Sequence, residues 1–167
     1  MGRLILVLLF FCNVTVVFSQ KVFSLYSPDN CLEVRINIGE KMEYSVWKGG
    51  ERLLCNSSLS MLLGDGQKWG HRALVRKIQR RKADRNISSP FYKKAHVKDC
   101  YNELELHFRG DYGVIFRAYN DGVAYRFIST GKKSFVVKEE TVEYCFPDDW
   151  KSHVAFVRTQ GYHKNNL

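Results

Sequence analysis

Proline and repeated sequence are both scarce in this 167-residue chain. Only 3 prolines occur, and neither proline nor glycine recurs with a fixed period, which excludes collagen-like and low-complexity designs. No internal repeat has the spacing of a solenoid or a propeller. A hydrophobic share of 45% with 14% aromatic residues excludes an intrinsically disordered chain. The length suits one ordinary domain and is too short for a barrel enzyme of the usual size.

The hydrophobic run at the start of the chain is too short for an ordinary membrane span. Residues 1–3 give a basic start, and residues 4–17 are apolar except for two polar positions. A span needs about 20 apolar residues. We therefore expect residues 1–20 to be a secretory signal peptide, cleaved after Ser19 or Gln20. The mature protein is expected to be secreted or periplasmic, with no membrane attachment.

Closely spaced cysteine pairs are missing, which disfavours a zinc site. Four cysteines follow the leader, and they permit three disulfide pairings or four free thiols. Their density is far below that of disulfide-stabilised scaffolds, which favours free thiols. The four residues are Cys31, Cys55, Cys100 and Cys145.

Alternating apolar and polar residues dominate the mature chain. Residues 103–108, 114–118 and 123–127 each place their apolar side chains on one face, as in half-buried strands. Residues 109–111 and 120–122 contain the Gly, Asp and Asn that favour tight hairpin turns. The pattern predicts a three-stranded antiparallel meander over residues 103–129.

Other short segments also have strand patterns. Residues 32–38 alternate cleanly, and residues 43–47 and 52–55 flank a Gly-Gly turn at 49–50. Two more strands are predicted downstream, at residues 135–137 and 141–145. No segment of 12 or more residues has a helical period with capping residues. We therefore expect an all-β fold, an antiparallel β-sandwich.

Positive charge is concentrated in one segment. Residues 72–85 contain seven cations and one anion, Asp84, so this segment could bind a polyanion. No aromatic residue is interleaved there for base stacking, and the leader argues against a nucleic-acid partner. We favour a solvated hairpin arm. The cations are Arg72, Arg76, Lys77, Arg80, Arg81, Lys82 and Arg85.

Clustered catalytic or metal-binding residues are missing as well. The five histidines are scattered, and no phosphate-binding loop or G-x-S-x-G motif is present. Glu103 and Glu105 share one strand face and could form a carboxylate pair. That face lies opposite the apolar row, so we expect both to be solvated. The sequence therefore predicts no catalytic residue, no metal site and no cofactor in this chain.

Tryptophans offer the best candidate carbohydrate contacts, because sugar faces stack on aromatic rings. Trp69 lies in a loop-like stretch, residues 64–70, and Trp150 follows a turn near the C-terminus. These two residues support a stand-alone carbohydrate-binding module as an alternative function. The third tryptophan, Trp47, is a weaker candidate, and all three could instead be core or edge residues.

Several segments resemble the N-terminal domain of glycoside hydrolase family 97. The most specific is FRAYNDGVAYRF at residues 116–127, supported by YNEL at 101–104 and FRGDY at 108–112. KVFSLYSPD at residues 21–29 is similar to the opening strand of that family. The resemblance covers most of residues 21–160, the β-sandwich domain, and leaves residues 161–167 as a tail.

The resemblance implies an exported α-glucosidase or α-galactosidase with three parts. An N-terminal sandwich of the galactose-mutarotase-like kind precedes a (β/α)8 catalytic barrel and a small β domain. The barrel supplies the catalytic carboxylates, and calcium assists hydrolysis. Because the chain stops at Leu167, we expect an incomplete super-sandwich without its barrel, inactive alone. Its expected partners are that barrel and an oligosaccharide or glycan, and the sugar and the retaining or inverting outcome stay open.

The matched positions of this family resemblance are expected to be structural. Gly122 should serve the hairpin turn. Arg117 and Arg126 could pair with carboxylates of neighbouring strands. Asn120 and Asp121 belong to the same turn motif.

Overall fold

The computed structural model describes residues 20–88 and 95–149, and in this part of the chain every regular element is a β-strand. The all-β prediction is therefore confirmed. Within the same residues, no helix has the length and hydrophobicity needed to cross a membrane. In chain order the strands are β1 (Lys21–Tyr26), β2 (Leu32–Ile38), β3 (Met42–Lys48), β4 (Glu51–Leu63), β5 (Lys68–Trp69), β6 (Val75–Ser88), β7 (His96–Phe108), β8 (Tyr112–Ala118), β9 (Val123–Ser129) and β10 (Val137–Val142).

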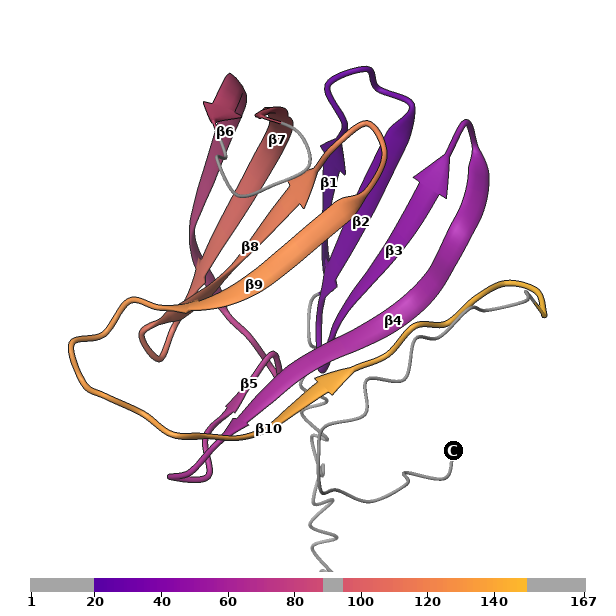
Figure 1. Cartoon of the computed structure of the whole chain (residues 1–167). Coiled ribbons are helices and arrows are strands. Elements are labelled where there is room, and N and C mark those ends of the chain that lie inside the picture. Colours follow the sequence, from indigo (N-terminus) through magenta and orange to yellow (C-terminus); the bar gives the residue numbers. More distant parts are fainter. Residues whose placement is uncertain (1–19, 89–94, 150–167) are drawn as a thin grey trace, which may run out of the picture.

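The strands form two antiparallel sheets (Figure 1). The first sheet has the order β1-β2-β3-β4-β10, with the short β5 also paired to β4. The second sheet has the order β6-β7-β8-β9. Figure 1 shows the second sheet on one side of the molecule and the first sheet on the other, as expected for a β-sandwich.

The predicted hairpins are present. Strands β7, β8 and β9 form the expected meander, and β2 has the predicted bounds. Gly49 and Gly50 connect β3 to β4 with φ angles of 58° and 87°. Two consecutive positive φ angles are those of the two-residue turn that matches the twist of paired strands, and glycine adopts them without a Cβ clash.

Two strand boundaries differ from the prediction. The two strands expected at 135–137 and 141–145 are one strand, β10, which pairs antiparallel with β4. Strand β4 runs from Glu51 to Leu63, well past the predicted residues 52–55. Its serine-rich middle lacks clean alternation. Pairing with β3 on one side and β10 on the other satisfies its backbone, which local residue preference does not reveal.

The core lies between the facing sides of the two sheets. Tyr44 of β3 and Phe116 of β8 connect them, with ring centroids 6.0 Å apart. Burying a large apolar side chain contributes about 1.5–3 kcal/mol relative to leaving it exposed. The largest apolar side chains that are almost completely buried are Val34, Ile36, Met42, Leu59, Leu104, Leu106, Val114 and Phe116.

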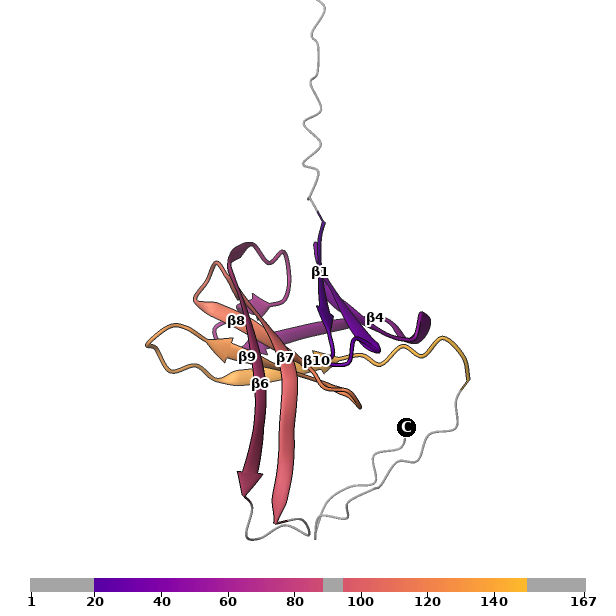
Figure 2. The same cartoon turned by 90° about the horizontal axis from the view of Figure 1, so that it is seen from above.

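Strands β6 and β7 extend beyond the second sheet as a two-stranded arm (Figure 2). They pair as far as Ser88 and His96, whereas β8 covers β7 only from Asn102 to His107. The predicted hairpin arm is therefore confirmed. Residues 89–94, the signal peptide apart from residue 20, and the tail at 161–167 lie outside the described residues.

Candidate functional site

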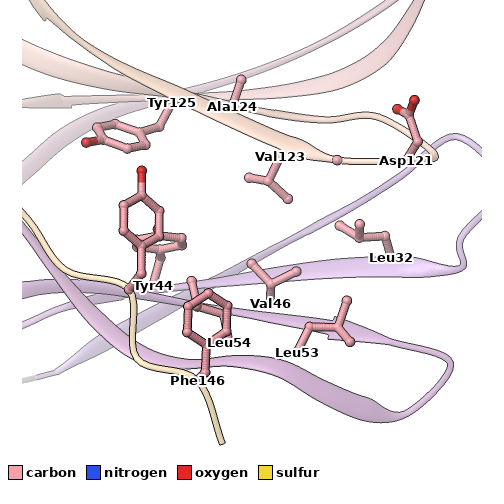
Figure 3. A pocket seen from close by; sticks show the side chains of 12 residues that line it. Leu32, Tyr44, Val46, Leu53, Leu54, Asp121, Val123, Ala124, Tyr125 and Phe146 are labelled. Carbon is pink, nitrogen blue, oxygen red and sulfur yellow. The ribbon is translucent and has the colours of Figure 1, made fainter. Parts of the chain in front are cut away.

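A cleft between the two sheets is the main cavity of interest in the described part of the chain. Its volume is about 460 Å³, and it opens between β9 of the second sheet and β3, β4 and the segment after β10. Figure 3 shows Val123 and Tyr125 of β9 facing Tyr44 and Val46 of β3 across it. The lining residues are Leu32, Tyr44, Val46, Leu53, Leu54, Asp121, Gly122, Val123, Ala124, Tyr125, Tyr144 and Phe146.

Two tyrosines give the cleft its polar character. The rings of Tyr44 and Tyr125 have centroids 6.1 Å apart, and the Tyr125 hydroxyl donates a hydrogen bond of 3.3 Å to Glu140 Oε1. Burial raises the pKa of Tyr44 to about 12. Burial also raises the pKa of Tyr125, and the nearby Glu140 carboxylate adds to this rise. Both phenols are therefore neutral at ordinary pH, and the cleft presents apolar and hydroxyl surface.

The carboxylates that sequence analysis placed in solvent are buried. Glu103 and Glu105 of β7 are only 4% and 6% exposed, so the prediction of solvated side chains is wrong. Arginines from the strands on either side cover them. Arg117 Nε of β8 lies 2.8 Å from Glu103 Oε2, and Arg81 of β6 lies 3.3 Å from Glu103 and 3.0 Å from Glu105.

The charge network continues along the same face of β7. His107 Nε2 lies 2.8 Å from Glu105 Oε1, and Arg85 Nε donates to Asp99 Oδ2 at 2.9 Å. The side chains of Leu104 and Leu106 point to the opposite face, into the core. The carboxylates therefore lie on the outer face of the second sheet, away from the cleft.

Trp69 is not available as a sugar platform. It is 4% exposed and stacks on Tyr112, with ring centroids 4.9 Å apart and planes 5° apart. The predicted carbohydrate contact at this residue is therefore wrong, because both rings belong to the core. Trp47 lies under the guanidiniums of Arg35 and Arg52, at 4.5 and 4.4 Å from its ring centroid. Trp150 lies outside the described residues.

The residues of the predicted turn motif have different roles. Arg117 pairs with a neighbouring carboxylate as expected, whereas Arg126 forms no ion pair with any described residue. Asn120 Oδ1 accepts a 3.2 Å hydrogen bond from the Asp29 backbone N–H, which connects the second sheet to the β1–β2 loop. Asp121 lies at the rim of the cleft (Figure 3).

Gly122 closes the hairpin between β8 and β9 in a conformation that other residues can also adopt. The turn closes with a 2.8 Å hydrogen bond from the Tyr119 N–H to the Gly122 carbonyl, but Gly122 has no positive φ. A Cβ at this position would meet nothing within 4 Å. Gly122 therefore serves the hairpin turn as predicted, and it does so without a positive φ.

The basic segment is largely engaged within the fold. Arg72 pairs with Glu40, Arg81 and Arg85 pair with β7 carboxylates, and Arg80 donates a 3.0 Å hydrogen bond to the Ser24 carbonyl. Fewer cations of residues 72–85 are then available to a polyanion, which favours the arm interpretation.

The described residues include no group of three or more histidine, cysteine or acidic side chains arranged to hold a metal ion. The calcium ion implied by the family resemblance therefore has no ligand set among them. None of the four cysteines after the leader forms a disulfide bond in this structure.

Comparison with known proteins identifies the family. The family model described as "Glycosyl-hydrolase 97 N-terminal" matches residues 25–166. The chain belongs to the glycosyl-hydrolase 97 N-terminal family. It is 43% identical over 141 residues to the retaining alpha-galactosidase of Bacteroides thetaiotaomicron, a match that covers 84% of this chain and 21% of that enzyme.

Solved structures support the same fold for this glycosyl-hydrolase 97 N-terminal domain. A family 97 glycoside hydrolase from Pseudoalteromonas sp. strain K8, in complex with panose, superposes with a TM-score of 0.67 at 20% identity, covering 75% of this chain and 20% of that one. A beta-arabinopyranosidase gives a TM-score of 0.67 at 28% identity, covering 75% and 21%. The chain thus spans about a fifth of the length of these relatives.

Sequence analysis missed the cleft and the aromatic residues that line it. Tyr44 and Tyr125 were assigned to strands without a role, and Tyr144 and Phe146 lie at or after a predicted strand end. Alternation indicated which side chains face the interior. It carried no signal for where the two sheets separate enough to leave a cleft.

Proposed function

We propose that this chain is the N-terminal structural module of an exported α-glycosidase, and that it holds polypeptide of the catalytic part while having no hydrolytic centre of its own. The observation that carries the proposal is the apolar cleft, because two aromatic side chains of one wall leave apolar surface open to solvent. Tyr144 and Phe146, which line the cleft, are 64% and 55% exposed. Exposed apolar surface that gathers at one edge is typical of an interaction site.

The proposed occupant of the cleft is polypeptide from the rest of a family 97 enzyme. The chain corresponds to about a fifth of its relatives, so such an enzyme has ample sequence to fill it. A free sugar is a weaker candidate. The cleft offers two neutral phenols and few charged groups, and no described tryptophan lines it.

The carboxylates support the absence of a hydrolytic centre. Glycoside hydrolysis needs two carboxyl groups on either side of the bond, about 5 to 9.5 Å apart, with one able to donate a proton. Glu103 and Glu105 are the carboxylate pair that sequence analysis singled out, but arginine side chains cover them on the face away from the cleft. Calcium, which the family resemblance implies for the whole enzyme, would take its ligands from other parts of that protein.

The test replaces the matched 141 residues of the Bacteroides thetaiotaomicron enzyme with those of this chain. We expect the chimera to hydrolyse an aryl α-galactoside and this chain alone to give no turnover. Val123→Asp in the cleft should abolish chimera activity, whereas the matched control Val22→Asp, at a position 59% exposed, should retain it. Equal activity of both variants would contradict the role of the cleft.

Turnover by the chain alone that disappears in Glu103→Gln or Glu105→Gln would contradict the absence of a hydrolytic centre. Calorimetry of the chain with α-galactosides and maltooligosaccharides tests the alternative function, a stand-alone carbohydrate-binding module. We expect no heat of binding at millimolar sugar, because Trp69 is inside the core.

A further inference from the structure

Two of the four thiols after the leader lie on adjacent stretches of backbone. Cys55 is in β4, and Cys145 follows β10 along the same edge of the first sheet. The Cys55 N–H donates a 2.7 Å hydrogen bond to the Cys145 carbonyl. The Glu143 N–H donates to the Ser58 carbonyl at 3.2 Å, so antiparallel pairing continues past the end of β10.

A bulge in β4 brings Cys55 opposite Cys145. On the β3 side, Tyr44 pairs with Ser57 and Val46 pairs with Leu54, so two residues of β4 stand opposite one of β3. On the other side, the regular register pairs Val142 with Leu59. Without the extra residue, Cys145 would stand opposite Asn56 rather than Cys55.

A buried serine fixes the two cysteine backbones to each other. Ser57 is 0% exposed, and its hydroxyl donates a 3.0 Å hydrogen bond to the Cys55 carbonyl. The same Oγ accepts a 3.0 Å hydrogen bond from the Cys145 N–H. The spacing of the two cysteines is therefore set by three hydrogen bonds and not by one strand contact alone.

Opposed residues of antiparallel strands have Cα atoms about 4.5–5.5 Å apart. That separation lies inside the range of about 4.4–6.8 Å found in disulfides. Desolvation, together with the neighbouring Cys55 thiol, raises the pKa of Cys145. The Cys145 side chain is exposed, so a reagent in solvent can reach it.

We propose that Cys55 and Cys145 form a disulfide bond that fixes the segment after β10 to β4. One thiolate attacks the disulfide of an oxidant, such as oxidised glutathione or an exported thiol oxidoreductase, and releases one thiol of that oxidant. The second cysteine thiolate then attacks the mixed disulfide and releases the other. Two protons leave the protein, and two electrons reduce the oxidant to a pair of thiols.

The bond would fix one wall of the cleft. Tyr144 and Phe146 flank Cys145 and line the cleft, so joining Cys145 to β4 restricts how far both rings can move. The inference does not depend on the proposed function, because it needs only the pairing of β4 with the segment after β10.

The test equilibrates the full chain with mixtures of oxidised and reduced glutathione, blocks remaining thiols by alkylation, and maps peptides by mass spectrometry. We expect a peptide pair joined through Cys55 and Cys145 and a rise in Tm of roughly 10 °C, since the bond closes a long loop. Cys55→Ser and Cys145→Ser should each lose both effects. The matched control Cys31→Ser/Cys100→Ser should keep both. Alkylation of both Cys55 and Cys145 under oxidising conditions, or their joining to other cysteines or to glutathione alone, would overturn the proposal.

Discussion

The two faces of strand β7 are buried in different ways. Leu104, on the core face, is 0% exposed because the first sheet covers it. Glu103, on the outer face, is 4% exposed although no sheet covers it, because Arg81 and Arg117 extend over it from the neighbouring strands. Burial on one face removes apolar surface from water. On the other face it removes charge from water, and ion pairs must offset the desolvation cost.

The largest expected effect is on the core face. Phe116→Ala should lower the free energy of unfolding by about 3–5 kcal/mol, because the lost side chain leaves a cavity between the sheets. Phe116 is 0% exposed and contacts the rings of Tyr44 and Tyr125. Urea unfolding followed by tryptophan fluorescence measures the loss. The control Ile78→Ala, at a side chain 47% exposed, should cost about 0.5 kcal/mol, and a similar loss for both would contradict this account of the core.

Substitutions on the outer face should cost less stability than those in the core, and the costs of substituting paired residues should be coupled. Glu103→Ala should cost about 2 kcal/mol, because both arginines then lose a charged hydrogen-bond partner but can reach solvent. Arg117→Ala should cost less in the Glu103→Ala background than in the wild type. A double-mutant cycle measures the difference, which we expect to be about 1 kcal/mol. Strictly additive losses would mean that the ion pair contributes nothing to stability.

Alkaline pH tests whether charge is tolerated on the core side. Burial raises the pKa of Tyr44 to about 12 from the usual 10.0, so the unfolded chain ionises first as the pH rises. The stabilisation is complete below pH 10 and is lost as the pH approaches 12. Tyr44→Phe should make the fall in urea midpoint over this range shallower. Tyr26→Phe, at a side chain 46% exposed, is the control and should leave the fall unchanged.

The sequence predicted one face of each strand well and the other poorly. Alternation identified Leu104 and Leu106 as core because the period of two reports which side is apolar. It placed Glu105 in solvent because the covering Arg81 comes from β6, more than twenty residues away. Residue type alone therefore indicates which side chains avoid water, and not which polar ones are enclosed.

Tertiary contacts explain why the candidate site was also misjudged. Trp69 has loop-like neighbours, and its burial depends on stacking with Tyr112, far along the chain. The Gly70 N–H donates a 3.2 Å hydrogen bond to the same Tyr112 hydroxyl. The cleft depends on how two sheets diverge, which no local pattern encodes. Turn positions, in contrast, were predictable because glycine and asparagine preferences act over a few residues.

The smallest effect is expected on the arm, where the core face of β7 has lost its cover. Leu104 lies on that face where the first sheet covers it, and Lys98 lies on the same face farther along the arm. The face therefore changes from apolar to charged where the first sheet no longer covers β7. Lys98 Nζ lies 3.5 Å from Asp84 Oδ1, with both side chains about two-thirds exposed, at 66% and 67%. Lys98→Ala should therefore cost at most about 0.5 kcal/mol in low salt and nothing measurable in high salt. Arg85→Ala should cost more, because its partner Asp99 is only 11% exposed on the outer face. Urea unfolding at two salt concentrations compares the variants, and a larger loss for Lys98→Ala would contradict the exposed position of Lys98 on the arm.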